Sequence, residues 1–238
     1  MAQPVRIENA TAGTIVNVAI NIIRSEPRAY FGLGLVAVLW SLIPIYGSAN
    51  SSRTLAVISA KAYQKLLGIE ATTQEIYQRL NRKLWSFWWL TLLGGIYISL
   101  LMLVCSIALI FFRFIHKVSF ILIGGLFLYL YGRASFAEVP LAVEPQQSVL
   151  GSLARSFSLS AGYARKIPMV FSISYLILCN IWLSIPYLFF TTMTAVLGGV
   201  FLFFLVTNAL LNTVLQVVKA VIYYDLVCLK EGIDLHIT

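Results

Sequence analysis

The chain has 238 residues, of which 60% are hydrophobic and 11% are charged, whereas charged residues make up about a quarter of a typical soluble domain. This composition excludes an ordinary soluble globular protein and favours a single transmembrane domain over residues 1–238. The net charge of +8 does not indicate a nucleic-acid partner, because the basic residues lie beside apolar runs instead of gathering on one solvated face.

The first predicted element is an amphipathic helix over residues 10–23. Two further segments have a similar character, one that begins at the capping box Thr72-Thr-Gln-Glu75 and one over residues 148–163. Because each leads into an apolar stretch, we expect three helices that lie in the cytoplasmic interface of a membrane. The apolar positions that share a face are Ile15, Val18 and Ile22 in the first helix and Leu150, Leu153 and Phe157 in the third.

Apolar segments long enough to cross a membrane follow these helices. A spanning helix needs about twenty apolar residues, because the hydrocarbon core is about 30 Å thick and each helical residue rises about 1.5 Å. Charge-free runs over residues 29–52, 84–112 and 167–218 meet this length, and a polar turn at residues 191–194 divides the last run. Together with two segments that carry charges, the predicted spans are residues 29–47, 48–68, 84–112, 118–143, 168–190 and 196–226.

The segment over residues 48–68 carries Arg53, Lys61 and Lys65, which are typical of a helix that lies flat on the membrane. Charge placement favours a crossing instead. If the segment crosses, ten Lys and Arg residues lie in the inner loops and two in the outer turns, as the positive-inside rule requires. Arg53 would then extend to the outer water and Lys65 to the inner. We predict six spans with both termini cytoplasmic, and the flat helix is the alternative.

An internal repeat supports this arrangement. An amphipathic lead-in, basic residues, a proline and an apolar span that ends in Trp-x-x-x-Pro occur twice, over residues 10–44 and 148–186. The predicted fold is therefore an all-α polytopic helical membrane protein with six transmembrane helices, arranged as three parallel hairpins that each follow an interfacial amphipathic helix. Parallel hairpins differ from the inverted repeats of many secondary transporters, which counts against a transport function.

Four short motifs occur in order along the second half of the chain: EVPLAVE at residues 138–144, ARSFSLSAG at 154–162, IYYDL at 222–226 and EGIDL at 231–235. Through them, nearly the whole chain resembles the membrane domain of some bacterial glycerophosphoryl diester phosphodiesterases, which also occurs in stand-alone six-helix proteins. The resemblance implies a fold and no reaction, because the hydrolase activity of that family resides in a separate soluble domain. We expect no counterpart of that domain here.

No catalytic motif is evident. The sequence contains no metalloprotease helix, phosphate-binding Gly-rich loop or nucleophile elbow. His116 falls in a predicted outer turn, without a serine or carboxylate at matched depth in the membrane. Cys105, Cys179 and Cys228 lie in apolar stretches and lack the spacing of a zinc site or a disulfide framework. We therefore expect no catalytic residue, no metal and no cofactor.

Charged residues in the inner half of the predicted spans form the candidate site, since a charge at the centre of a spanning helix costs about 2.5–3.5 kcal/mol. In one interpretation, the cations form a basic pocket between helices that holds an anionic lipid headgroup. In the other, which we favour, the charges neutralise one another, either as Arg133 with Glu138 and Lys219 with Asp225 or through partners on other helices. The candidate residues are Lys61, Lys65, Arg133, Glu138, Lys219 and Asp225.

We therefore predict a non-catalytic integral protein of a bacterial plasma membrane or internal membrane. It would act through helix-surface contact, as a scaffold, assembly factor or accessory subunit of a membrane complex. Its partners would be anionic lipids of the inner leaflet and other membrane proteins or a second copy. The alternative is a transporter or flippase of a lipid or small anion, in which Lys61 and Arg133 line a wet cavity. A membrane enzyme that acts on lipid phosphate is least favoured, because no base or nucleophile is evident.

Overall fold

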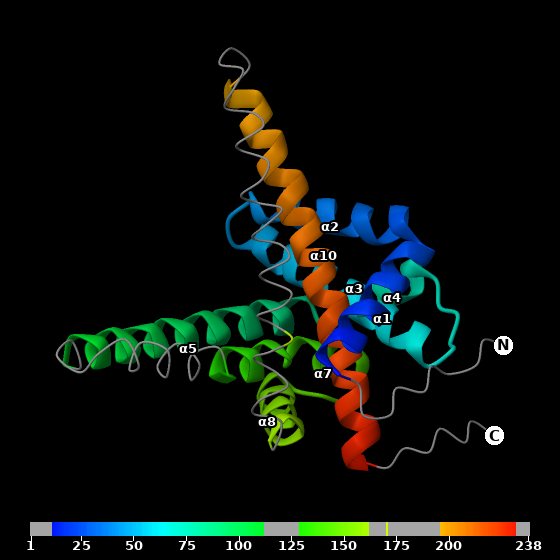
Figure 1. The fold of residues 1–238 in the computed structure, drawn as a ribbon. Helices are drawn as coiled ribbons and strands as arrows, with labels where there is room; N and C mark the ends of the chain where they lie inside the picture. The colour runs from blue at the N-terminus through cyan, green and yellow to red at the C-terminus, as the bar shows by residue number, and fades with distance from the viewer. Residues whose placement is uncertain (1–10, 112–128, 162–169, 171–195, 232–238) are drawn as a thin grey trace.

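The computed structural model describes residues 11–111, 129–161, 170 and 196–231. These residues are mostly helical and include no strand, which confirms an all-α fold for this part of the chain. Residues 129–135 are helical as well. The helices, drawn in Figure 1, are α1 (Ala12–Ser25), α2 (Pro27–Ser41), α3 (Tyr46–Leu66), α4 (Thr73–Asn81), α5 (Leu84–Phe111), α7 (Glu138–Val143), α8 (Val149–Ser160) and α10 (Val196–Glu231).

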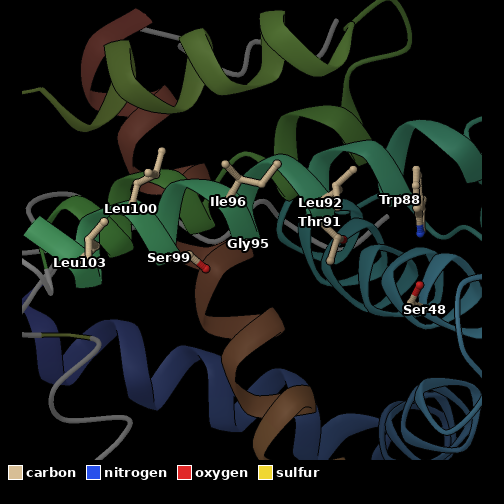
Figure 2. Close-up of a pocket in the computed structure, with 9 residues that line it drawn as sticks. All are labelled: Ser48, Trp88, Thr91, Leu92, Gly95, Ile96, Ser99, Leu100 and Leu103. Carbon is tan, nitrogen blue, oxygen red and sulfur yellow. The ribbon is translucent and has the colours of Figure 1, made fainter.

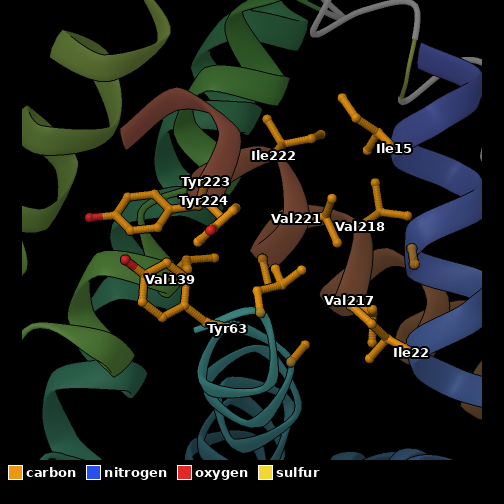
Figure 3. Packing of buried hydrophobic residues seen from close by; sticks show 14 of the residues in the cluster. Ile15, Ile22, Tyr63, Val139, Val217, Val218, Val221, Ile222, Tyr223 and Tyr224 are labelled. Atoms are coloured by element: carbon orange, nitrogen blue, oxygen red, sulfur yellow. The ribbon is translucent and has the colours of Figure 1, made fainter. Parts of the chain in front are cut away.

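Helices α3 and α10 form the centre of the fold. The 36 residues of α10 give it a length of about 54 Å, and its C-terminal half is buried against other helices. Figure 3 shows Val218 and Val221 of α10 beside Ile15 of α1, and Tyr223 beside Tyr63 of α3. The apolar core therefore joins the two ends of the described chain, and the hydrophobic effect on these side chains holds the helices together.

Helix α2 packs closely on α10 at Gly34. A Cβ atom at this position would lie 2.6 Å from the backbone oxygen of Ala209, so only glycine fits without movement of a helix. Tyr30 lies one turn before Gly34 in α2, and its side chain is fully buried. Its carbonyl accepts a hydrogen bond of 3.3 Å from the hydroxyl of Thr213 in α10. Close backbone approach therefore determines how α2 and α10 cross.

Helix α2 is shorter than the predicted span over residues 29–47. It begins at Pro27, which suits the first position of a helix because its nitrogen needs no hydrogen bond there. It ends at Ser41, before Pro44, since a proline disfavours the helical conformation in the residue that precedes it. Its 15 residues extend about 22 Å, less than the thickness of a hydrocarbon core. The helix thus ends six residues before the predicted boundary.

Helix α3 corresponds to the predicted span over residues 48–68, but most of its surface contacts protein. Thirteen of its 21 residues are buried, so α3 is a central helix of the fold. Arg53, which we expected to extend to the outer water, is 7% exposed and donates hydrogen bonds to Asn50 at 2.5 Å and to the Tyr77 hydroxyl at 2.8 Å. Asn81 accepts another. The expectation was wrong because α4 turns back along α3 and supplies two of these acceptors, Tyr77 and Asn81.

Two helices in the described part of the chain are long and apolar enough to cross a membrane, by length and composition. They are Leu84–Val104 within α5 and Phe203–Glu231 within α10, which correspond to the predicted spans 84–112 and 196–226. In α5, 11% of an apolar stretch of 18 residues is buried inside the protein. The corresponding share in α10 is 67%. Both helices extend away from the core, in different directions (Figure 1).

Two other predicted spans fall wholly or partly outside the described residues. The span over residues 168–190 is described only at Val170, and the span over residues 118–143 only from residue 129. In the second, a turn at residues 136–137 separates residues 129–135 from α7. The described residues therefore show an all-helical chain with two candidate spans, and the count of six stays a prediction.

The predicted amphipathic helices are present as α1, α4 and α8. The capping box that opens α4 is confirmed, because Thr72 and Glu75 each accept a hydrogen bond of 3.3 Å from the backbone N–H of the other. In α1 the apolar face packs on α10, with Ile15 completely buried. The face that we expected to lie on a membrane is thus covered by protein, since a neighbouring helix can bury the same apolar stripe.

Helix α8 differs from α1 in which side chains it buries. It buries Ser152, Ser156 and Ser160, which are spaced four residues apart, while Leu150 is 71% exposed. Small side chains at this spacing allow a close approach to the helical segments before it. Part of the predicted apolar face of α8 therefore points away from the protein, as an interfacial helix requires.

Candidate functional site

Two of the candidate lysines meet at one carboxylate. The Nζ atoms of Lys61 and Lys65, one turn apart on α3, lie 2.6 and 2.7 Å from the two carboxylate oxygens of Glu26. Glu26 lies between α1 and α2, so these ion pairs fasten the C-terminal end of α3 to the start of α2. The hydrogen bonds that Lys61 and then Lys65 donate lower the pKa of Glu26 below its usual value. The carboxylate therefore stays charged further into the acid range.

Hydroxyl groups hold the same two lysines. Lys61 donates a hydrogen bond of 3.1 Å to Thr73, and Lys65 donates one of 2.6 Å to Ser25. The Lys61 ammonium also lies 5.6 Å from the centre of the Tyr30 ring, within the range of a cation–π contact. The side chain of Lys61 is 12% exposed, whereas that of Lys65 is 34% exposed. The cluster is therefore anchored at Lys61 and open to the outside at Lys65.

Glu138 and Lys219 form a second ion pair of 2.9 Å, between α7 and α10. Gln216 donates a hydrogen bond of 2.9 Å to the same carboxylate oxygen and accepts one of 2.7 Å from Ser59 of α3. Ser59 is fully buried and Gln216 nearly so. A chain of polar contacts therefore links three helices, and the cationic partner of Glu138 is on another helix.

Arg133 is bound by α8. Its Nε donates a hydrogen bond of 2.9 Å to the Ser160 hydroxyl, and a terminal nitrogen donates one of 2.5 Å to the carbonyl of Phe157. The guanidinium also lies 4.8 Å from the centre of the Phe157 ring. These partners are neutral. Of the two possibilities considered for Arg133, the pair with Glu138 is not formed and partners on another helix are found. The acceptors come from α8, and Glu138 pairs with Lys219 instead.

One described residue from each of the four short motifs takes part in a group of contacts between the end of α7, α8 and α10. These residues are Glu144, Arg155, Tyr223 and Glu231. Glu144 accepts a hydrogen bond from the Tyr223 hydroxyl and one of 3.2 Å from Arg155, which also pairs with Glu231. Burial alone would raise the pKa of Glu144, but the hydrogen bonds from Tyr223 and Gln147 and the charge of Arg155 outweigh it and lower the pKa. One carboxylate at the end of α7 therefore joins this helix to α8 and α10.

A shallow apolar groove runs along α5. It has a volume of about 590 Å³ and is open along its length. Figure 2 shows Thr91, Gly95 and Ser99 in a row on α5, with Ser48 of α3 at one end. A Cβ atom added at Gly95 would have no neighbour within 4 Å, so the groove floor is open at this position. The other lining residues are Trp88, Leu92, Ile96, Leu100 and Leu103.

The structure distributes the six candidate residues over separate contacts. Lys61 and Lys65 share Glu26, and the other cations have separate partners. Among the described residues no group of three His, Cys, Asp or Glu side chains is placed to hold a metal ion. The resulting groups are Lys61 and Lys65 at Glu26, Lys219 at Glu138, Arg133 at α8, and Asp225, which is fully buried in α10.

Sequence reasoning identified Glu138 but missed two other carboxylates that organise these contacts, Glu26 and Glu144. A signal for Glu26 was present, because it is the one acidic residue between Arg24 and Arg28 and its charge must meet a cation. Glu144 gave no such signal, since its partners Arg155 and Tyr223 are distant in the sequence and only the fold brings them together.

No family model, curated protein or solved structure matches this chain. The resemblance to the phosphodiesterase membrane domain therefore stays a prediction from the four motifs. What the protein does has to be argued from its surfaces and contacts.

Proposed function

We propose that this protein is an integral membrane protein that acts by contact, as a scaffold, assembly factor or accessory subunit of a membrane complex. The observation that carries the proposal is the exposed apolar surface of α5. This helix has 28 residues and a length of about 42 Å. Within its apolar stretch of 18 residues, 11% is buried inside the protein. Exposure of so long an apolar surface to water is energetically unfavourable, so a bilayer or a partner protein must cover it.

Aromatic and basic residues at the start of α5 support a membrane boundary there. Trp85 and Trp89 are about half exposed, and Arg79 and Arg82 precede them. Tryptophan is enriched at the level of lipid headgroups, and basic residues at the cytoplasmic side. The start of α5 would then lie at the cytoplasmic surface. The outward Leu150 of α8 supports the same placement, because it directs an apolar side chain toward lipid.

In the proposed topology the chain crosses a bacterial plasma or internal membrane six times, as three parallel hairpins with both termini in the cytoplasm. Helices α5 and α10 are two of these spans. The charge asymmetry of the sequence supports this orientation, since ten Lys and Arg residues fall on the inner side and two on the outer.

The groove on α5 gives the contact function a structural basis. Thr91, Gly95 and Ser99 follow one another at intervals of four residues, and small residues at this spacing allow two transmembrane helices to approach closely. The flanking Ile96 and Leu100 add apolar surface on the same face. We propose that a transmembrane helix of another subunit packs in this groove.

A pair of adjacent glycines allows a sharp test. Gly95→Leu would fill the groove, whereas Gly94→Leu would not, because Gly94 does not line it. A Cβ atom at either position has no neighbour within 4 Å, so both variants should fold. We expect partners that copurify with the wild-type chain after mild detergent extraction to be lost from Gly95→Leu and kept by Gly94→Leu. Equal copurification with both variants would contradict the proposal.

The alternative function, transport or flipping of a lipid or small anion, requires charged residues that share one wet cavity. Lys61 and Arg133 were the residues predicted to line it, yet Lys61 binds Glu26 and Thr73 while Arg133 binds α8. This separation favours contact over transport. An uptake assay in proteoliposomes tests the alternative directly, and a saturable flux that Lys61→Gln abolishes would support it.

A further inference from the structure

The start of α2 and the end of α3 form the most basic cluster among the contacts described above. Lys61 and Lys65 share Glu26, and the exposed Arg24 and Arg28 flank that residue in the sequence. Two lysines thus bind one carboxylate, and two exposed arginines lie within two residues of it in the sequence. We propose that this cluster binds the phosphate group of an anionic lipid headgroup, and that Glu26 takes the place of the phosphate when no lipid is bound.

The geometry of the carboxylate supports this exchange. Each oxygen of Glu26 accepts one lysine, at 2.6 Å from Lys61 and 2.7 Å from Lys65. A phosphate group also presents two oxygens that can accept one ammonium each. Thr73 and Ser25 hold the two ammonium groups independently of the carboxylate. The cations would therefore keep their positions when Glu26 moves away.

The first turn of α2 adds a second attraction for an anion. Glu26 is the residue before this helix, and its side chain caps no backbone N–H. The free N–H groups of a helix start carry a partial positive charge and favour a phosphate or carboxylate. The Glu26 carboxylate thus binds the two lysines and does not accept a hydrogen bond from the first turn of α2.

The open side of the cluster allows a headgroup to enter. The side chain of Glu26 is 41% exposed and that of Lys65 is 34% exposed, whereas Lys61 is mostly covered. In the proposed topology this cluster lies at the cytoplasmic end of the first hairpin, at the depth of the inner-leaflet phosphates. The inference therefore rests on the proposed membrane location, although not on the proposed partner helix.

The test uses the full-length chain in a neutral detergent, titrated with phosphatidylglycerol, phosphatidylcholine or inorganic phosphate and followed by native mass spectrometry. Glu26→Gln removes the internal competitor and should raise the affinity for phosphatidylglycerol about fivefold. Lys65→Gln and Lys61→Gln should each lower it about fivefold, since each basic residue near an anionic lipid surface contributes a factor of this size. Phosphatidylcholine and inorganic phosphate should bind weakly and respond little to these variants.

Matched controls separate a defined site from general charge. Glu70→Gln and Arg82→Gln change exposed residues by the same charge at other positions and should leave the affinity unchanged. If the ion pairs had a purely structural role, Glu26→Gln and Lys65→Gln would change the affinity for phosphatidylglycerol in the same direction. That result would overturn the proposal. Equal effects from the controls, or tight binding of inorganic phosphate alone, would also overturn it. Release of the chain from membranes by alkaline carbonate would instead refute the proposed membrane location.

Discussion

At the scale of single residues, Glu26 joins α2 to α3 through Lys61 and Lys65. Because these lysines lower its pKa, the carboxylate adds stability above its ordinary pKa and loses that stability as the pH falls through the lowered value. Glu26→Gln should therefore lower the free energy of unfolding at pH 7 by roughly 1 kcal/mol or less, since Glu26 is 41% exposed.

Thermal unfolding in detergent at several pH values checks this prediction. The difference between Glu26→Gln and the wild type should shrink as the solution becomes more acidic than the ordinary pKa of a glutamate, about 4.3. Glu70→Gln serves as the control, because Glu70 lies exposed in the turn after α3. If the stability difference between Glu26→Gln and the wild type stayed constant down to the most acidic pH, the charge of Glu26 would not be the source of that difference.

The ion pair of Glu138 and Lys219 is more deeply buried, with side chains 25% and 10% exposed. Lys219→Met should destabilise the protein by about 2–3 kcal/mol, because it leaves a mostly buried carboxylate without its cation. The double variant Glu138→Gln with Lys219→Met should recover most of this loss. A double-mutant cycle of thermal stabilities measures the coupling, and losses that simply add would show that the two side chains act independently.

At this scale, the sequence predicts which charges matter better than it predicts their partners. All six candidates lie in or beside the predicted spans, and four of them have ion-pair partners in the structure. The pair of Arg133 with Glu138 was expected from proximity in the chain alone. It does not form, because the helices bring Lys219 to Glu138 and Ser160 to Arg133, and no local spacing encodes those distances.

At the scale of elements, the crossing of α2 and α10 depends on a single glycine. Gly34→Ala would place a Cβ atom 2.6 Å from the backbone oxygen of Ala209, so the helices would have to separate. We expect a loss of about 1–3 kcal/mol, as for other overpacked sites. Gly32→Ala is the matched control in the same helix, because its added Cβ has no neighbour within 4 Å.

The control variant should be neutral or more stable by up to about 1 kcal/mol, since alanine favours a helix more than glycine does. Thermal unfolding followed by circular dichroism compares the two variants. Equal stabilities of Gly34→Ala and Gly32→Ala would mean that α2 moves away from α10 at little cost.

Periodicity predicted amphipathic helices correctly, but it did not indicate what each helix would contact. The stripe of α1 that contains Ile15 and Ile22 is buried on α10, whereas α8 buries Ser152, Ser156 and Ser160 and exposes Leu150. Both patterns have one apolar face, and the pattern alone does not distinguish lipid from protein as the cover. The capping box of α4 was predictable in full, because Thr72 and Glu75 act on each other within a single turn.

At the scale of the whole molecule, the proposed topology places both termini in the cytoplasm. Reporter proteins fused to either end should therefore be active only if they function inside the cell. A protease added outside spheroplasts should remove neither an N-terminal nor a C-terminal tag, and it should remove both in inverted vesicles. Opposite sides for the two tags would require an odd number of spans, as would follow if residues 48–68 did not cross.

Composition was sufficient to predict an all-helical chain, and hydropathy located the two long helices α5 and α10. The central position of α3 was not predictable in the same way. Its Asn50 and Arg53 are polar residues typical of a surface, yet both are buried. They hydrogen-bond to each other, and α4 supplies Tyr77 as a further acceptor for Arg53. When neighbouring helices hydrogen-bond the polar groups of a buried helix, its hydropathy resembles that of a surface helix. Its central position is therefore evident only from tertiary contacts.

The burial of α1, α2 and α3 against α10 also has a consequence for synthesis. Ile15 and Tyr63 leave the ribosome long before Val221 and Tyr223, which belong to the same apolar core. Roughly 150 residues separate α3 from this part of α10, and at about 5–20 residues per second their translation takes on the order of ten seconds. During that interval the early helices lack their main packing partner. In the proposed membrane location, a nascent chain that stalls before α10 is therefore expected to be a substrate for membrane proteases, and the core described here is completed only when α10 is made.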